Sequence, residues 1–326
     1  MWRRTKRVVL VLVGLFVVAA IGGAAYQSYA SRKDLAATQP PGQLVDVGGH
    51  RLHIWCIGSG MPAVILDSGL GGTAFDWADV QPEVAKYTQV CSYDRAGMGY
   101  SDPGPTPRTS VRIANELLEL LKRSSISTPV VLVGASFGGF NVRIFASEYS
   151  DRVAGLVLVD ARHEDESARS AAAGLPPEEP WYAMLVPVAG SLGILRLMGI
   201  TLGPPPAFTP PSVRSFVSAT AYRTSRYATM ANELIHAQES MAQVRQSRRL
   251  LSIPVIVLSA GRRPPGRGAE IQLELQRDQA KLSSRSCLVI AERSGHVIAH
   301  DQPELLVNSI RAVIDAGADT NSKPGC

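Results

Sequence analysis

A serine in a glycine-rich pentapeptide is the residue of this sequence best suited to nucleophilic chemistry. The pentapeptide Gly134-Ala135-Ser136-Phe137-Gly138 directly follows the apolar run Val130 to Val133 and directly precedes a helical run. A strand, a sharp turn and a helix form the context that leaves a serine hydroxyl exposed above a sheet. Glycines on both flanks let the chain turn tightly. The pattern predicts that Ser136 is a nucleophile; the alternative is a glycine-rich turn with an incidental serine.

A histidine near the end of the chain is the expected partner of that serine. A serine hydroxyl is a weak nucleophile at neutral pH and needs a base to accept its proton. His296, in Ser294-Gly295-His296, comes just after the last expected strand and before a terminal helix that begins near Pro303. This location predicts that His296 is the general base, with His300 as the alternative. Three further histidines accompany earlier strands: His50, His53 and His163.

The strands expected to position these two residues are short apolar runs. Several of the runs are separated by helix-like segments. Most are continuous rather than alternating, as expected for strands buried on both faces. Helix-like segments such as 110–122 and 137–148 lie between them, which predicts an α/β fold with a mostly parallel eight-stranded sheet and helices on both faces. The Gly48-Gly49 turn predicts an antiparallel hairpin at its start. The expected strands are 44–47, 51–57, 63–67, 89–93, 130–133, 155–160, 254–259 and 287–291.

The segment between Asp160 and Ile253 lacks convincing strands and, at about 90 residues, is too long for an ordinary connection. It predicts a helical cap over 161–250, inserted after strand six of a core formed by 44–160 and 251–318. Residues 212–250 are expected to form two helices. Four apolar residues would either line an acyl pocket or form the cap's own core: Trp181, Tyr182, Leu192 and Met198.

The charge distribution argues against nucleic acid as a partner. The chain of 326 residues is 45% hydrophobic, which suits one large domain with an insertion, and it carries a net charge of +5. Six of its 33 Lys and Arg residues lie in residues 1–33, which hold no acidic residue. The remainder therefore balances 27 basic against 28 acidic residues, and a basic surface is not expected.

The N-terminus carries a candidate membrane anchor over residues 1–30, followed by a linker over 31–43. Val8 to Ala25 is free of charge, and about 18 such residues approach the minimum that spans a bilayer. The basic cluster before it predicts a cytoplasmic N-terminus and an exported body. A signal peptide cleaved after Ser28-Tyr29-Ala30, giving a secreted protein, is the alternative.

The four cysteines, Cys56, Cys91, Cys287 and Cys326, form no CxxC pair. They have no histidine at metal-ligand spacing, so a metal site is not expected. Cys56 and Cys91 lie on strands expected to be neighbours, and an exported location permits a disulfide between them. Two buried free thiols are nevertheless the expectation.

Four motifs together resemble the α/β-hydrolase superfamily, in its serine-hydrolase (AB hydrolase-1) type with a helical cap. They are Asp67 to Gly72, Tyr93 to Asp102, the serine pentapeptide and Ser294 to His296, in the expected order over roughly 44–316. The resemblance implies that the backbone N–H groups of Leu70 and Phe137 form an oxyanion hole, and that no cofactor is needed. Asp94 and Arg95, in the second motif, are interpreted as structural.

The acid of the triad departs from the common family pattern. Most members place it beyond the seventh strand, but Leu258 to Pro264 contains no carboxylate. Some members use the end of the sixth strand, where Asp160 stands, and this choice gives the order Ser, Asp, His. Asp160 is the expected acid. The alternatives are Asp165, Glu270 and Asp278.

The resemblance implies transfer of an acyl group to water, with a small-molecule carboxylic ester as the expected substrate. Peptidase, lactonase and carbon–carbon bond hydrolase activities stay open because the same groups serve each. Dehalogenase and epoxide hydrolase chemistry are disfavoured, since relatives that perform them place an aspartate where Ser136 stands. A ligand-binding relative without activity and an envelope scaffold are the alternatives from other classes. The oligomeric state is not indicated.

Overall fold

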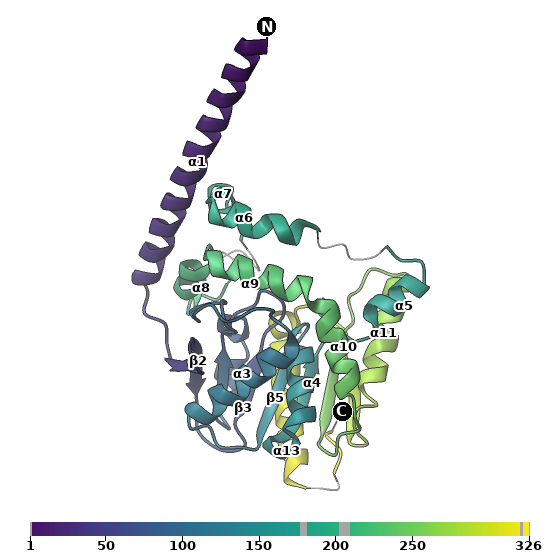
Figure 1. Cartoon of the computed structure of the whole chain (residues 1–326). Helices are drawn as coiled ribbons and strands as arrows, with labels where there is room; N and C mark the ends of the chain where they lie inside the picture. The colour runs from purple at the N-terminus through teal and green to yellow at the C-terminus, as the bar shows by residue number, and fades with distance from the viewer. Residues whose placement is uncertain (1, 177–180, 202–208, 320–321, 326) are drawn as a thin grey trace.

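One mixed sheet forms the centre of the chain (Figure 1). The computed structural model describes residues 2–176, 181–201, 209–319 and 322–325. Within them eight strands lie in the spatial order β1-β2-β4-β3-β5-β6-β7-β8. The strands are β1 (Gln43–Asp46), β2 (Arg51–Ile57), β3 (Val64–Asp67), β4 (Val90–Tyr93), β5 (Val130–Ala135), β6 (Val153–Val159), β7 (Val255–Ala260) and β8 (Ser286–Ala291).

The strand directions confirm the mostly parallel α/β-hydrolase sheet. β1 pairs with β2, and β2 with β4, in antiparallel fashion, whereas every pairing from β4 through β3 and β5 to β8 is parallel. The expected hairpin is therefore correct, and the antiparallel part extends one strand further. The carboxyl ends of the parallel strands share one edge, so the loops that follow them meet there.

Helices cover both faces of this sheet, as expected (Figure 1). The core elements are η1 (Ala74–Trp77), α2 (Gln81–Val84), α3 (Ser110–Arg123), α4 (Gly138–Glu148), η2 (Ser150–Arg152), α11 (Arg267–Gln279), α12 (Ile298–Asp301) and α13 (Pro303–Ala318), where η marks 3₁₀ helices. Ile65 and Leu132 point into the apolar cluster that contains α3 and α4. Val64 and Val131, their neighbours, join the cluster of α2 and α13 on the other face. Burial on both faces explains why these strands are continuous apolar runs.

The cap above the strand ends is helical (Figure 1). Its elements are α5 (Glu166–Ala172), η3 (Trp181–Met184), α6 (Leu185–Ser191), α7 (Ile194–Leu197), α8 (Arg214–Thr220), α9 (Thr224–Ile235) and α10 (Ala237–Ser247). The expectation of two helices in 212–250 is wrong, because the structure has three. The break between α9 and α10 falls at His236, which caps both helices with φ −95° and ψ 14°. Neither proline nor glycine marks this bend, so its position could not be predicted from the residue types.

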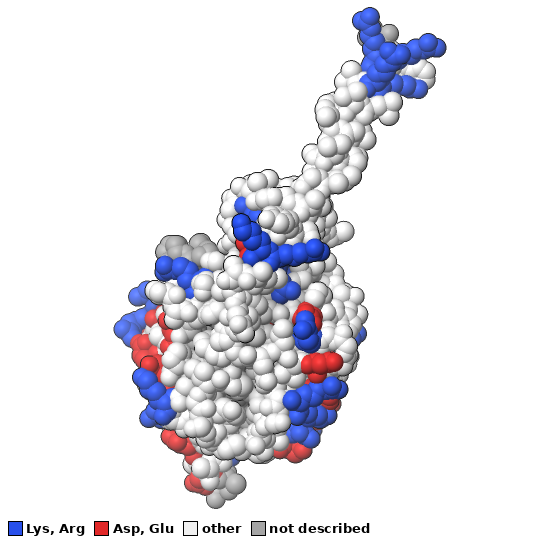
Figure 2. Space-filling model, turned by 90° about the vertical axis from the view of Figure 1, so that its left-hand side faces the viewer, with Lys and Arg blue, Asp and Glu red and all other residues white. Residues whose placement is uncertain are grey.

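The N-terminal segment is one continuous helix, α1 (Trp2–Ala36). By length and composition α1 is able to cross a membrane, and its apolar window is not buried by the rest of the chain. Figure 2 shows Lys and Arg gathered at its free end, above an uncharged shaft. The helix continues to Ala36, so the first residues of the expected linker are helical instead.

A disulfide joins β2 to β4. Cys56 and Cys91 are register partners in this antiparallel pair, with their Cα atoms 4.0 Å apart. The expectation of two buried free thiols is therefore wrong. The sequence correctly indicated that the strands are neighbours, but it could not fix the register that places the two sulfur atoms opposite each other.

Candidate active site

Ser136 occupies a strained turn between β5 and α4. Its φ is +48°, in the left-handed region that non-glycine residues rarely adopt. A side chain at Gly134 would collide with Val142, and one at Gly138 would collide with the backbone oxygen of Asp67. The two glycines are therefore required by the close approach of the helix to its neighbours, and Ser136 carries the strain of the sharp turn. Such strain is typical of residues whose position serves function.

The backbone of Ser136 is held by the end of the neighbouring strand. The Ser136 N–H donates to the Val159 carbonyl oxygen at 3.0 Å, and the Arg162 N–H donates to the Ser136 carbonyl oxygen at 3.0 Å. Asp160 lies between these two partners and also has a positive φ, of +41°. The turns that follow β5 and β6 therefore fix each other.

Asp160 and His296 meet at the carboxyl edge of the sheet. His296 Nδ1 lies 2.6 Å from Asp160 Oδ2. The other carboxylate oxygen accepts hydrogen bonds from the Ala260 N–H at 3.0 Å and from the Arg263 guanidinium. Burial alone would raise the pKa of Asp160, but the His296 hydrogen bond, the Arg263 charge and the Ala260 N–H outweigh it and lower the pKa. The carboxylate is thus ionised at neutral pH and favours a proton on His296 Nδ1, which leaves Nε2 free to act as a base.

The loop that carries His296 is fixed by the residues around it. The Gly295 N–H donates to Asp301 Oδ2 at 2.8 Å, and the Ser294 hydroxyl donates to the same carboxylate at 3.2 Å. The Arg262 N–H donates to the Ser294 carbonyl oxygen at 2.8 Å. The loop after β8 is therefore attached to the loop after β7.

The loop after β3 lies beside the serine turn, and each of these two segments carries one of the backbone N–H groups expected to bind an oxyanion, those of Leu70 and Phe137. A side chain at Gly69 would come within 3.3 Å of Ser136 Cβ, so the loop after β3 passes directly beside the serine. Within the described residues, no hydrogen bond is found from the backbone N–H of Leu70 or of Phe137 to a backbone or side-chain acceptor. N–H groups without acceptors, close to a candidate nucleophile, are suited to binding a developing oxyanion.

Arg95 holds the loop after β3 in place. Its guanidinium donates to the backbone oxygens of Ser68 and Gly69 at 2.6 and 2.8 Å. It also pairs with Asp67 and with Glu233 of α9, each at 2.8 Å. The structural interpretation of Arg95 agrees with these contacts. Asp94 likewise binds the Ala74 and Tyr100 N–H groups.

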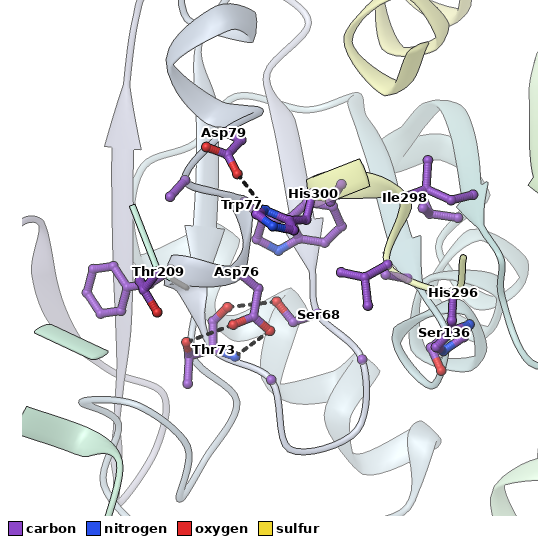
Figure 3. A pocket seen from close by; sticks show the side chains of 18 of the residues that line it. Ser68, Thr73, Asp76, Trp77, Asp79, Ser136, Thr209, His296, Ile298 and His300 are labelled. Atoms are coloured by element: carbon purple, nitrogen blue, oxygen red, sulfur yellow. Dashed lines mark hydrogen bonds and ion pairs between the residues drawn. The ribbon is translucent and has the colours of Figure 1, made fainter. Parts of the chain in front are cut away.

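A cavity of about 760 Å³ opens at this edge of the sheet, and both Ser136 and His296 line it. Figure 3 shows their side chains at one end of the cavity. The rest of the wall is mainly apolar, and includes Phe75, Trp77 and Val217. Three of the four cap residues considered for a pocket, Trp181, Leu192 and Met198, do not line it, and Trp181 and Met198 are exposed. The side chain of Tyr182 is outside the described residues.

The alternative acids and bases have other partners. His300 Nδ1 lies 3.1 Å from Asp79, at the rim of the cavity. His53 is buried against Asp94, and His163 against Asp278. His50 lies 3.4 Å from Glu116. Asp165 pairs with Arg245, and Glu270 with Arg267, on the surface. Of these histidines, His300 alone lines the cavity with Ser136, and its partner Asp79 has a side chain that is 37% exposed, whereas that of Asp160 is 1% exposed.

Three charged residues at the site were not predicted from the sequence. Arg263 contacts Asp160 from the loop after β7, which contains no carboxylate from Leu258 to Pro264. Glu233 and Arg226 come from α9: the first pairs with Arg95, and the second lines the cavity and donates to the Gly71 carbonyl oxygen. Only the missing acid in the β7 loop was a usable signal for Arg263.

The sheet, the cap and the serine turn together define the class as an α/β hydrolase. The chain belongs to the alpha/beta hydrolase family, whose model matches residues 64–309. It is 24% identical over 253 residues to the uncharacterized protein YqjL of Bacillus subtilis, across 76% of this chain and 82% of YqjL. It is 30% identical over 151 residues to the probable transporter efuK of Hormonema carpetanum, across 43% of this chain and 21% of efuK. The chain spans half or less of three curated relatives that it matches.

Solved structures share the fold. An esterase from Thermogutta terrifontis has a TM-score of 0.60 at 23% identity, over 84% of this chain and 98% of the esterase. A putative epoxide hydrolase from Pseudomonas aeruginosa has a TM-score of 0.64 at 18% identity, over 85% and 96%. An enol-lactonase from Burkholderia xenovorans has a TM-score of 0.58 at 16% identity, over 84% and 100%. At these identities the likeness concerns the fold alone.

Proposed function

We propose that this chain is a serine hydrolase that cleaves a carboxylic ester or a similar acyl substrate. The observation that carries the proposal is the 2.6 Å contact between Asp160 and His296, at a cavity that Ser136 also lines. Esterase, epoxide hydrolase and lactonase are all represented among the structural neighbours. Serine rather than aspartate at the turn favours acyl chemistry over epoxide opening.

The proposed reaction uses each group once in acylation and once in deacylation. Ser136 Oγ attacks the carbonyl carbon while His296 Nε2 takes its proton, and Asp160 stabilises the imidazolium through Nδ1. The N–H groups of Leu70 and Phe137 donate to the oxyanion. His296 then protonates the leaving alcohol. Water next attacks the acyl-enzyme while His296 accepts its proton. Collapse of this intermediate breaks the bond between the acyl carbon and Ser136 Oγ, and Oγ takes that proton back from His296 as the acid leaves.

Labelling by a fluorophosphonate probe tests this proposal. We expect one covalent adduct on Ser136 of the folded chain, because a base-activated serine reacts and an ordinary serine does not. Ser136→Ala should lose the adduct and the hydrolysis of p-nitrophenyl esters, whereas Ser191→Ala, at an exposed serine of the cap, should keep both. Folded wild-type protein without an adduct would favour a ligand-binding relative. Esters of graded acyl length would then define the substrate class.

α1 is proposed to anchor the protein, with the hydrolase body on the extracytoplasmic side of the membrane. Four basic residues precede the apolar stretch and two follow it: Arg3, Arg4, Lys6, Arg7, Arg32 and Lys33. Basic flanks tend to stay in the cytoplasm, so the N-terminus is assigned there. The disulfide between Cys56 and Cys91 supports the assignment, because such bonds persist in oxidising compartments.

A further inference from the structure

The first half of the cap presents large apolar side chains to the outside. Residues 181–200 contain a single charged residue, Arg196. Contiguous exposed apolar surface of this kind marks contact with a protein, a ligand or a membrane. We name six of the exposed apolar side chains of this segment the cap face. They are Met184, Leu185, Val188, Leu197, Met198 and Ile200, all at least 44% exposed.

Arg196 does not reduce the apolar character of the cap face, because it is directed toward α1. Its guanidinium donates to Gln27 Oε1 at 2.8 Å, to Asp34 Oδ2 at 2.7 Å and to Ser31 Oγ at 3.2 Å. All three partners lie on the carboxyl-terminal part of α1. The one charge of the segment therefore fastens the cap to α1 and leaves its exterior uncharged.

The contact between the cap and α1 lies where the apolar stretch of α1 ends. A side chain at Gly23 would collide with the Leu192 carbonyl oxygen, so the two backbones touch between α6 and α7. Before this point the large side chains from Val8 to Ile21 are exposed. After it, Gln27 and Ala30 are buried. The cap face is therefore level with the boundary between the bare and the covered parts of the helix.

The arrangement in space agrees with this boundary. Figure 1 shows α6 and α7 beside α1, with α8 and α9 between them and the sheet. Figure 2 shows that the uncharged shaft of α1 ends at the body, where Lys and Arg side chains appear again. A bilayer around the shaft would meet α6 and α7 before any other part of the body.

We propose that the cap face inserts into the lipid leaflet on the body side of the membrane, as a second attachment beside α1. The inference rests on the proposed anchor, because α1 sets the level of the bilayer. Uncharged helices with Leu, Met and Val on the outside are suited to the boundary between headgroups and acyl chains. The occupant is a lipid bilayer, and continuity with α1 favours it over a soluble partner.

The test uses full-length protein in vesicles of phosphatidylcholine and phosphatidylglycerol. Among the described residues no cysteine is free, so Leu197→Cys provides a thiol for an environment-sensitive fluorophore. Leu250→Cys is the matched control, because Leu250 is 72% and Leu197 76% exposed, and Leu250 precedes β7 at the opposite edge of the sheet. Nitroxide-labelled lipids should quench the Leu197 label by about twofold or more and leave the Leu250 label nearly unchanged.

A charged variant separates insertion from anchoring. In a chain labelled at Val188→Cys, the double substitution Leu197→Asp and Met198→Asp should lower quenching to the Leu250 level, since burying two carboxylates in the leaflet is unfavourable. Resistance to carbonate extraction, which reports α1, should not change. The turnover of a water-soluble ester by this double variant should also equal that of the wild type, because neither residue lines the cavity.

Three results would overturn the proposal. An unquenched Leu197 label in carbonate-resistant protein would refute insertion and keep the anchor. Release of the protein by carbonate would refute both the anchor and the insertion. It would not affect the hydrolase proposal, which the labelling of Ser136 tests separately. A Leu197 label shielded from aqueous iodide but not quenched by lipid, with a cross-linked dimer, would assign the cap face to a second copy of the chain.

Discussion

Asp160 is more constrained than any other side chain of the candidate triad. One of its oxygens is bonded to His296, and the other accepts from the Ala260 N–H and Arg263. Its backbone is held as well, because the Asp160 N–H donates to the Leu258 carbonyl oxygen at 2.8 Å. Such a carboxylate fixes both the tautomer and the orientation of the imidazole.

We predict that Asp160→Asn lowers kcat by about ten-thousand-fold while the chain stays folded. An amide at this position donates as well as accepts, so it favours the wrong tautomer of His296. The measurement is ester turnover, with circular dichroism to check folding. Asp165→Asn is the control, because Asp165 pairs with Arg245 on the surface. Near-normal turnover of the Asp160 variant would move the role to another carboxylate.

At the residue scale, the three residues of the candidate triad could be proposed from the sequence, but the residues that support them could not. Ser136 and His296 lie in short motifs that contain glycine, and the glycines indicate that the chain turns tightly at each position. Asp160 followed from the absence of an acid in the β7 loop. Arg263 was not identified, although the missing acid pointed to its loop, because its role depends on which loop lies next to β6, and that is a property of the folded sheet.

α9 links the cap to the core at the loop after β3. Glu233 pairs with Arg95, and both side chains are almost fully buried. Arg226, on the same helix, donates to the Gly71 carbonyl oxygen at 2.9 Å. Through these contacts α9 determines the conformation of the loop that carries the Leu70 N–H.

Glu233→Ala should lower the free energy of unfolding by about 3–5 kcal/mol, because it leaves the Arg95 charge buried without one of its partners. Unfolding by denaturant measures the loss. Glu239→Ala is the matched control, since Glu239 is exposed on α10 and its loss should change stability by less than about 0.5 kcal/mol. Equal losses for the two variants would show that the buried pair does not stabilise the cap.

The periodicity of apolar residues predicted the strands of the core, but it did not predict which side chains of the cap are buried. The strands of the core were expected from continuous apolar runs, and all eight are present. In the cap, large apolar or aromatic residues differ in burial: Tyr227 is buried, whereas Trp181 and Met198 are exposed. Composition alone does not distinguish the inside of an inserted segment from its outside, because that depends on how α1 and α9 approach it.

At the scale of the whole molecule, a buried carboxylate joins segments that are distant in the chain. Glu164, just after β6, pairs with Arg143 of α4 at 2.6 Å and with Arg248 after α10 at 3.1 Å. Burial by itself would raise the pKa of Glu164, but the hydrogen bonds and charge of Arg143 outweigh it and lower the pKa to about 2. The folded chain therefore favours the ionised form.

The stability that Glu164 provides should be lost in acid. Because its pKa is lower in the folded chain, the contribution is complete above the ordinary value of 4.5 and disappears as the pH falls toward 2. The shift corresponds to a contribution on the order of 3 kcal/mol. Wild type should have a higher Tm than Glu164→Gln at pH 7, and the difference should shrink between pH 4.5 and pH 2. A difference that is constant with pH would contradict this assignment.

The attachment of α1 to the cap also determines how the body moves. A body on a disordered tether would tumble in every direction, but here the helix is unbroken to Ala36 and Arg196 fastens its last turns. Rotation of the body is therefore coupled to rotation of the helix. With α1 in a bilayer as proposed, the candidate triad would stay at a nearly constant height above the lipid headgroups, and its encounters with any molecule confined to that surface would become a problem of lateral diffusion in two dimensions.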